Sequence, residues 1–246
     1  MKEVKIIGRL GNQLFQFAHA YSEIHNSSEV DKNYCLYFSE TIPPIDFNCL
    51  KYPPKHIEIG DYGQFIDYFE SEKFFDHDLI RGIYTPNNEK IRYFNKKYGD
   101  LKNSLFITVR RGDFVTLKES YICCNTKYYN SCYQKITKNG KRYDKIFISS
   151  DDLEWCKKNL KFHNGDNIIY LDNEEPFDII QLASLCKDFI ISTSTFSWWC
   201  AWMGEKNGGI VICPNKKFII GKEEKNRIFF PERWQKVESM NGLYEI

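Results

Sequence analysis

Short apolar runs alternate with helically patterned stretches through the second half of the chain. The short runs are typical of strands buried on both faces, and the periodic stretches are typical of helices that cover such strands. Strands are predicted at 105–109, 145–149, 167–171, 188–192 and 210–213, and helices at 126–137, 153–160, 179–185 and 196–203. This regular alternation predicts an α/β fold with a doubly wound parallel sheet.

The first 100 residues contain one clear strand–turn–helix unit. A strand at 4–7 is followed by the glycine-bearing turn 8–13, and apolar residues then recur at helical spacing from Leu14 to Ile24. A strand at 33–38 and a partly helical, aromatic segment at 63–83 are also expected. Because the pattern changes near residue 100, we predict two lobes, 1–100 and 101–246.

Composition excludes several classes of protein. The 34 Lys and Arg residues balance 33 Asp and Glu, so the chain lacks the excess positive charge of a nucleic-acid binder. Charged residues interrupt the apolar positions at the N-terminus, so we expect no signal peptide, and no apolar run is long enough to span a membrane. The nine cysteines are scattered without a CxxC pair, which predicts reduced thiols in a cytoplasmic protein.

Two adjacent arginines follow the strand at 105–109. Side chains alternate along a strand, so Arg110 shares a face with Thr108 and Arg111 lies opposite. One guanidinium group can then face a ligand while the other is held locally, with Asp113 as the expected partner. Arginine grips phosphate oxygens with a planar fork and stays charged at any working pH. The alternative for such a motif is a surface cluster of arginine and aspartate.

Other polar residues follow the predicted strands at 145–149 and 188–192. Asp151 and Asp152 follow the first, and Ser194 and Thr195 follow the second. The carboxyl ends of parallel strands meet at one rim, where open α/β sheets bind ligands. These residues therefore predict a diphosphate site in which arginine, hydroxyl groups and helix N–H groups replace a metal ion. Helix capping explains the same four residues without a ligand.

Three further features have a structural explanation. Trp199 and Trp202 lie in a helix too apolar for a surface, so we expect them in the core. Asp76-His77-Asp78 matches the DxD pattern of metal-dependent glycosyltransferases, but it lies in a charged, helical segment. The five histidines show no spacing typical of a metal site. We therefore predict no metal site.

These motifs resemble those of the α-1,2-fucosyltransferases of glycosyltransferase family 11. The matching segments, in family order, are Gly8–Ala18 (GxxGNQxFQ(Y/F)A), Arg110–Asp113 (HxRRxD), Ser150–Cys156 (SDD…WC), Ser184–Lys187 (SLCK), Ser194–Trp202 (SxFSWWxAW) and Pro231–Trp234 (PxxW). They extend from residue 8 to residue 234, so the resemblance covers nearly the whole chain.

The resemblance implies a GT-B-like fold of two Rossmann-like lobes, with the acceptor on lobe 1–100 and the donor on lobe 101–246. It implies GDP-β-L-fucose as donor, a galactose-terminated glycan as acceptor, inversion at the anomeric carbon and no metal. The catalytic residues it implies are Arg110, Asn12 and Asp113. The implied donor-binding residues are Arg9, Gly11, Thr108, Arg110, Asp151, Asp152, Ser194, Thr195 and Phe196.

The sequence departs from the family pattern at two positions. Thr108 stands where the motif has a histidine, which contacts guanine in related fucosyltransferases, and Thr193 stands where many members have asparagine. Two alternatives therefore remain: the same fold with another nucleotide-sugar donor, and a non-catalytic protein that binds nucleotide or glycan. A nicotinamide-dependent oxidoreductase is disfavoured, because the first turn lacks GxGxxG.

Overall fold

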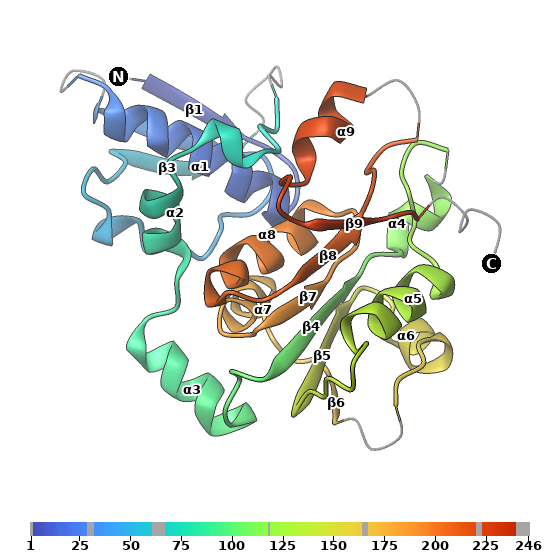
Figure 1. Cartoon of the computed structure of the whole chain (residues 1–246). Helices are drawn as coiled ribbons and strands as arrows, with labels where there is room; N and C mark the ends of the chain where they lie inside the picture. The colour runs from blue at the N-terminus through green and yellow to red at the C-terminus, as the bar shows by residue number, and fades with distance from the viewer. Residues whose placement is uncertain are drawn as a thin grey trace. The chain divides into compact units, whose positions relative to one another are not determined.

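The chain folds into two compact units, Met1–Thr85 and Pro86–Ile246. The computed structural model describes residues 2–28, 32–60, 67–117, 119–163, 167–219 and 223–239 (Figure 1). The boundary between these compact units lies at 85–86, whereas the division of the chain into two lobes at 100–101 stays a prediction.

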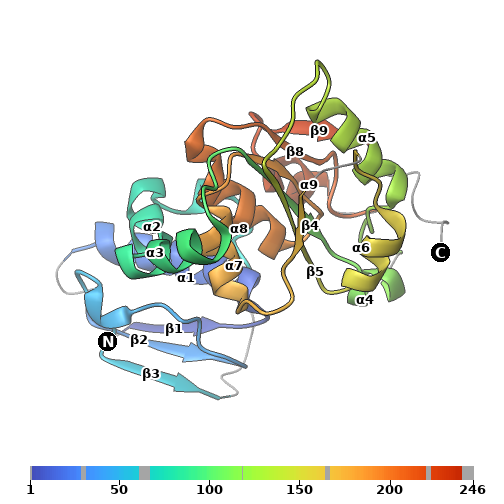
Figure 2. The same ribbon diagram turned by 90° about the horizontal axis from the view of Figure 1, so that it is seen from below.

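The first unit is a three-stranded parallel sheet with helices packed on it. The strands are β1 (Lys2–Ile6), β2 (Tyr34–Phe38) and β3 (His56–Ile59), in the order β1-β2-β3. Helices α1 (Leu10–Asn26) and α2 (His77–Tyr84) lie over one face of this sheet (Figure 2). The hydroxyl of Tyr84 donates to the Leu14 carbonyl (2.9 Å), which fastens α2 to α1. The predicted strand–turn–helix unit is thus present, and β3 is an addition to it.

The second unit contains the doubly wound sheet that the alternating pattern predicts. Its strands are β4 (Ser104–Val109), β5 (Lys145–Ser150), β6 (Ile168–Tyr170), β7 (Asp188–Ile190), β8 (Val211–Pro214) and β9 (Gln235–Val237). Their order is β6-β5-β4-β7-β8-β9, and every described pairing is parallel. The chain winds outward from β4 in one direction and then from β7 in the other. The boundary between β4 and β7 is therefore the topological switch point of the sheet.

Helices cover both faces of this second sheet. The unit contains α3 (Asn88–Tyr98), α4 (Gly112–Thr116), α5 (Thr126–Ile136), α6 (Leu153–Asn159), α7 (Pro176–Ala183), α8 (Thr195–Gly204) and α9 (Glu223–Phe229). Helices α5 and α6 lie on one face, and α7 and α8 lie on the other (Figures 1 and 2). The segment from 110 to 125, which the sequence pattern predicted as a loop, contains the short helix α4. Helix α3, helix α9 and strand β9 were not predicted.

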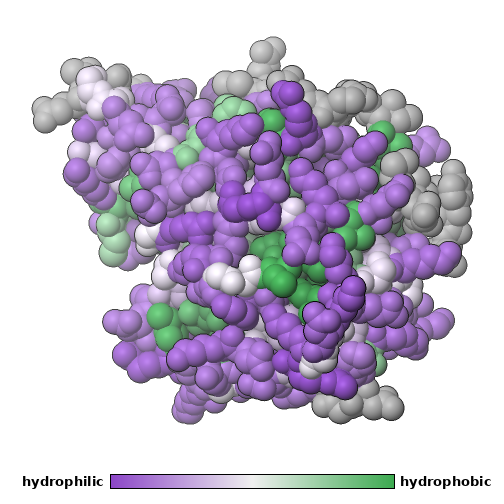
Figure 3. Space-filling view, in the orientation of Figure 1, coloured by the Kyte–Doolittle hydropathy of each residue, from purple (hydrophilic) through white to green (hydrophobic). Residues whose placement is uncertain are grey.

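Alternation along the strands gives the two faces different cores. Residues such as Ile107, Ile148 and Ile190 pack in a hydrophobic cluster with side chains of α5 and α6. The intervening Phe106 and Phe147 stack with their ring centroids 6.2 Å apart, in line with the side-to-side alternation of a strand. Figure 3 shows a mostly hydrophilic surface on the face of Figure 1, as expected when apolar side chains fill such cores.

Helix α8 lies in the core of the second unit. Its residues from Ser197 to Gly204 are all buried. Trp199 and Trp202 are fully buried with their rings 5.4 Å apart, which confirms the expectation that they are core residues. The N-cap of α8, Ser194, lies four residues after the end of β7, so the partly exposed first turn of the helix lies at the edge of the sheet.

Candidate functional site

The switch point brings two of the predicted segments together. Arg110 follows β4, and Ser194 follows β7, the neighbouring strand. The loop at Ile122 and Cys123 links the two ends: Thr193 Oγ1 donates to the Ile122 carbonyl (2.7 Å), and the Cys123 thiol donates to the Arg110 carbonyl (3.8 Å). Because burial raises the pKa of the Cys123 thiol, this group stays protonated as a donor. The arginine and the start of α8 thus lie at one edge of one sheet.

Two carboxylates orient the guanidinium group of Arg110. Its Nη2 is paired with Asp113, and its Nη1 lies 2.9 Å from Asp151 Oδ2. The side chain is 21% exposed and lies 5.5 Å from the Phe114 ring centroid. The expectation that Asp113 holds the arginine turned away from the ligand is wrong, because Asp113 pairs with Arg110 itself. Arg110 therefore has a fixed orientation and retains accessible surface.

Arg111 has a structural environment of its own. Its guanidinium carbon lies 4.1 Å above the Trp155 ring, and its Nε donates to Asp152 Oδ2 at 3.2 Å. Asp152 also caps α6, because its Oδ1 accepts from the Trp155 N–H (3.0 Å). Capping thus accounts for Asp152 without a ligand. Arg111 is the more enclosed of the two arginines, at 12% exposure.

Asp151 connects the two arginines. Its Oδ1 accepts from the Arg111 backbone N–H (2.8 Å), and its Oδ2 faces Arg110. Gly112 makes this arrangement possible, because a Cβ at that position would lie 2.4 Å from Asp151 Oδ2. Sequence reasoning did not assign a role to Gly112. The signal that could have indicated this role is the position of Gly112 in the motif, between the two arginines and the aspartate.

Replacing Gly112 with alanine is expected to displace the Asp151 carboxylate from Arg110. The approach of 2.4 Å is too short for any real Cβ contact, so the aspartate must move. We expect GDP, the nucleotide that the family resemblance implies, to bind at least tenfold more weakly to this variant than to the wild type, as measured by titration calorimetry. Gly82→Ala is the matched control, since a Cβ on Gly82 meets nothing within 4 Å. Unchanged GDP affinity in Gly112→Ala would contradict the role given to the Arg110–Asp151 pair.

The start of α8 is a chain of hydroxyl groups. Ser194 Oγ accepts from the Ser197 N–H at 3.1 Å, so Ser194 is the helix cap. The hydroxyl of Ser197 lies 2.7 Å from those of Ser194 and Ser192. Thr195 and Phe196 follow as the first helical residues and are both partly exposed. The partial positive charge of a helix N-terminus thus lies beside the switch point.

The two departures from the family pattern are both buried. Thr108 is 1% exposed, and its hydroxyl accepts from the Ser192 N–H at 3.3 Å, between β4 and β7. Thr193 is also 1% exposed and donates to the Ile122 carbonyl. The hydroxyl of Thr108, expected to contact the nucleotide, is engaged within the sheet. Both threonines therefore support the edge of the sheet at which Arg110 lies.

The glycine turn of the first unit is held by two glutamines. Gly8 has a φ of +81°, which favours glycine, and precedes Arg9, the exposed N-cap of α1. The Gln16 side chain both donates to the Ile7 carbonyl (2.7 Å) and accepts from the Ile7 N–H (3.1 Å). Gln13 Nε2 donates to the Thr41 carbonyl at 2.8 Å, after β2. Sequence reasoning missed these roles, although polar residues at core-facing helical positions were the signal.

Two predicted residues of this turn have different environments. Gly11 is buried in the first turn of α1, whereas Asn12 is partly exposed. The side-chain nitrogen of Asn12 lies 3.2 Å from the position that a Cβ on Gly8 would occupy. The turn therefore presents Arg9 and Asn12 at the carboxyl end of β1.

The DxD-like segment serves as a helix start. Asp76 caps α2 by accepting from the Leu79 N–H (3.0 Å), and Asp78 lies in the first turn. Within the described residues, no group of three or more His, Cys, Asp and Glu side chains could hold a metal ion. All nine cysteines are free thiols, as expected. The described part of the chain has no helix long and apolar enough to cross a membrane.

Several known proteins are similar to this chain in sequence. The profile of the family "Glycosyl transferase family 11" matches residues 31–237. The alpha-1,2-colitosyltransferase of Escherichia coli is 29% identical over 95% of this chain and 98% of its own length. The O-antigen biosynthesis glycosyltransferase WbnK of Escherichia coli is 27% identical over 64% and 56%, and human galactoside alpha-(1,2)-fucosyltransferase 1 is 31% identical over 35% and 23%.

A solved structure extends the comparison to the fold. The glycosyl transferase family 9 protein from Veillonella parvula DSM 2008 superposes with a TM-score of 0.51 at 8% identity, covering 86% of this chain and 80% of that one. The fold is therefore α/β and GT-B-like, which confirms the predicted fold class. The family profile spans most of the sequence. The chain belongs to glycosyl transferase family 11 and is a glycosyltransferase.

Proposed function

We propose that the protein transfers L-fucose from GDP-β-L-fucose to the 2-hydroxyl group of a galactose-terminated glycan. The observation that carries this proposal is the position of Arg110 and the start of α8 on the two sides of the β4–β7 switch point. Open α/β sheets bind nucleotides at such a point. Membership of family 11, with relatives named for alpha-1,2 transfer, supports the reaction.

The proposed reaction is a single displacement with inversion. The bond between the anomeric carbon and the β-phosphate oxygen breaks, and its electron pair leaves with GDP. The acceptor 2-oxygen forms the new bond from the opposite face, so a β-linked donor gives an α-linked product, and the proton of the hydroxyl group passes to water. In this proposal the departing charge is neutralised by protein groups rather than by a metal ion.

Each residue has a defined part in this proposal. Arg110 contacts the β-phosphate, and Asp113 orients Arg110, since the two side chains are paired. Ser194, with the N–H groups of Thr195 and Phe196, contacts the phosphates at the start of α8. Asp151 fixes Arg110 from the opposite side. For the first unit, the proposal gives Asn12 a part in catalysis and Arg9 a part in donor binding, on the strength of the family motif at residues 8–18.

A second candidate donor is the GDP-activated form of colitose. The relative named alpha-1,2-colitosyltransferase aligns over 95% of this chain, whereas the human fucosyltransferase aligns over 35%. Colitose is L-fucose without its 3-hydroxyl group, so the same diphosphate site serves either sugar. The choice between these donors depends on contacts to one hydroxyl group, and sites that hydrogen-bond a hydroxyl discriminate strongly against an analogue that lacks it.

Liquid chromatography of reaction products tests the proposal. The protein is incubated with GDP-fucose or GDP-colitose and a panel of galactose-terminated acceptors, and the linkage of the product is determined. We expect an α-1,2-linked product, and GDP should compete better than UDP or dTDP in binding. No product with either donor, or equal affinity for all three nucleotides, would contradict the proposal.

A further inference from the structure

We propose that an aromatic ridge on the first unit, made of Tyr68, Phe69, Phe74 and His19, binds the sugars that precede the terminal galactose of an oligosaccharide acceptor. This inference rests on the proposed function, since it names a substrate subsite of the same enzyme. The ligand is a pyranose chain of at least two residues. The following four observations concern the first unit alone.

Three of the four rings of the ridge, those of His19, Phe69 and Phe74, contact one another. His19 stacks on Phe69 with ring centroids 3.8 Å apart and an interplanar angle of 24°. Phe74 meets Phe69 edge-on at 5.8 Å and His19 at 6.3 Å. Phe74 is 39% exposed, and His19 and Phe69 are partly exposed. The exposed parts of these rings add no hydrophobic stabilisation to the fold, so the cluster is a candidate for ligand contact.

Phe69 is held in a conformation that a bulky residue rarely adopts. Its φ is +54°, in the left-handed region. The Asp67 carboxylate stabilises this backbone by accepting from the N–H groups of Tyr68 (2.6 Å) and Phe69 (3.3 Å). The strained backbone places the Phe69 ring on His19. Strain of this kind is concentrated at ligand-binding positions.

The hydrogen bond of His19 determines its tautomer. Its Nδ1 lies 2.9 Å from the Phe74 carbonyl oxygen, which can only accept. In the neutral ring Nδ1 therefore carries the hydrogen atom, and Nε2 is an acceptor. The ridge thus combines apolar ring faces with an acceptor for a hydroxyl group. A sugar offers the complementary surfaces, a face of C–H groups and a rim of hydroxyl groups.

The ridge begins at the glycine turn and extends along α1. Between Gly11 and Ala20, only Asn12 and His19 are not buried. Their spacing of seven residues places both on one face of the helix, about 10 Å apart along its axis. Tyr68 places the ridge beside the glycine turn, because its Cε1 lies 3.4 Å from the position that a Cβ on Gly8 would occupy. A galactose at Asn12 would therefore have its preceding sugars over Tyr68, Phe69 and His19.

Acceptor length tests the ridge. A galactose-terminated trisaccharide and methyl galactoside are compared as acceptors for the wild type, Phe74→Ser and His19→Phe. We expect the ratio of the trisaccharide KM to the methyl galactoside KM to rise about tenfold in Phe74→Ser. A smaller rise is expected in His19→Phe, which keeps a ring but loses the Nε2 acceptor. Ile59→Ser removes a 50% exposed apolar side chain of the same unit, and its ratio should equal that of the wild type.

Binding measured without donor separates this inference from the proposed function. Saturation-transfer NMR reports contact between the trisaccharide and aromatic protons, even if no tested GDP-sugar supports turnover. Circular dichroism confirms that each variant is folded. The proposal for the ridge would be overturned if folded Phe74→Ser bound the trisaccharide as strongly as the wild type does. It would also be overturned if Ile59→Ser lost as much binding as Phe74→Ser. Binding by the wild type without turnover would instead count against the proposed reaction.

Discussion

Arg110→Ala is expected to lower kcat/KM for glycosyl transfer by about 10²–10³-fold, because one preorganised charge at a developing anion contributes that much to the rate. Arg110 is oriented by Asp113 and Asp151, so the proposed departure of GDP requires no reorganisation of this side chain. The loss should appear mainly in kcat, since charge develops in the transition state. Initial rates over a range of donor concentrations measure it.

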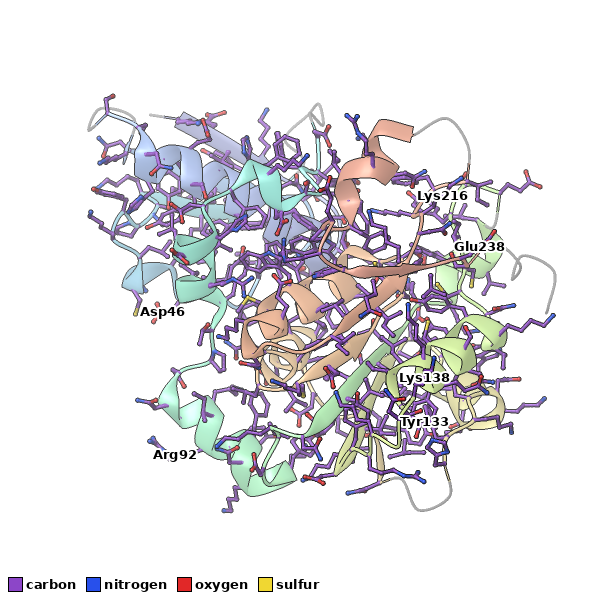
Figure 4. The ribbon with its side chains drawn as sticks, viewed as in Figure 1. Asp46, Arg92, Tyr133, Lys138, Lys216 and Glu238 are labelled. Atoms are coloured by element: carbon purple, nitrogen blue, oxygen red, sulfur yellow. The ribbon has the colours of Figure 1, made fainter. Side chains whose placement is uncertain are left out.

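Two further variants make this result specific. Arg110→Lys keeps the charge but loses the planar fork, so we expect activity between those of alanine and the wild type. Arg92→Ala removes an exposed arginine from α3 and should have no effect on activity (Figure 4). If Arg110→Ala is folded and retains wild-type kcat, Arg110 does not stabilise the leaving group.

Most of the second sheet could be predicted because its central strands, β5, β4, β7 and β8, are largely buried on both faces. Such strands appear in the sequence as short apolar runs, as at Leu105–Val109. The first unit gave a weaker signal: β3 has no buried residue, so its pattern is not that of a core strand. Helix α3 buries only Phe94 fully, and its position depends on ion pairs such as Lys97–Glu174 (2.6 Å) that are distant in sequence.

The candidate site could be predicted only as a set of residues at strand ends. Sequence order does not determine which carboxylate meets which arginine, and Asp113 pairs with Arg110 because helix α4 turns the chain back immediately after β4. That Thr108 and Arg110 lie on one side of the strand stays a prediction, and alternation could not show that the Thr108 hydroxyl accepts from the Ser192 N–H, just beyond the end of β7. Close approaches such as that at Gly112 require coordinates.

A buried carboxylate lies at the first residue of β7, at the opposite end of the strand from the candidate site. Asp188 is fully buried, and its carboxylate accepts from Lys141, from the Tyr143 hydroxyl (2.8 Å) and from the Ile210 N–H (2.6 Å). Burial and the neighbouring Asp188 raise the pKa of Tyr143, so its hydroxyl remains a donor. Asp188 thereby joins β7 to the start of β8 and to the segment before β5.

Asp188→Ala is expected to lower the free energy of unfolding by about 3–5 kcal/mol, because it leaves the buried Tyr143 hydroxyl, the Ile210 N–H and a lysine without their acceptor. Urea denaturation followed by circular dichroism measures this loss. Asp178→Ala is the matched control: Asp178 also binds a lysine, Lys90 at 2.8 Å, but both side chains are partly exposed. That pair should contribute less than about 1 kcal/mol. Equal losses in the two variants would show that burial of Asp188 does not determine its contribution, and that β7 is held in place by its apolar contacts alone.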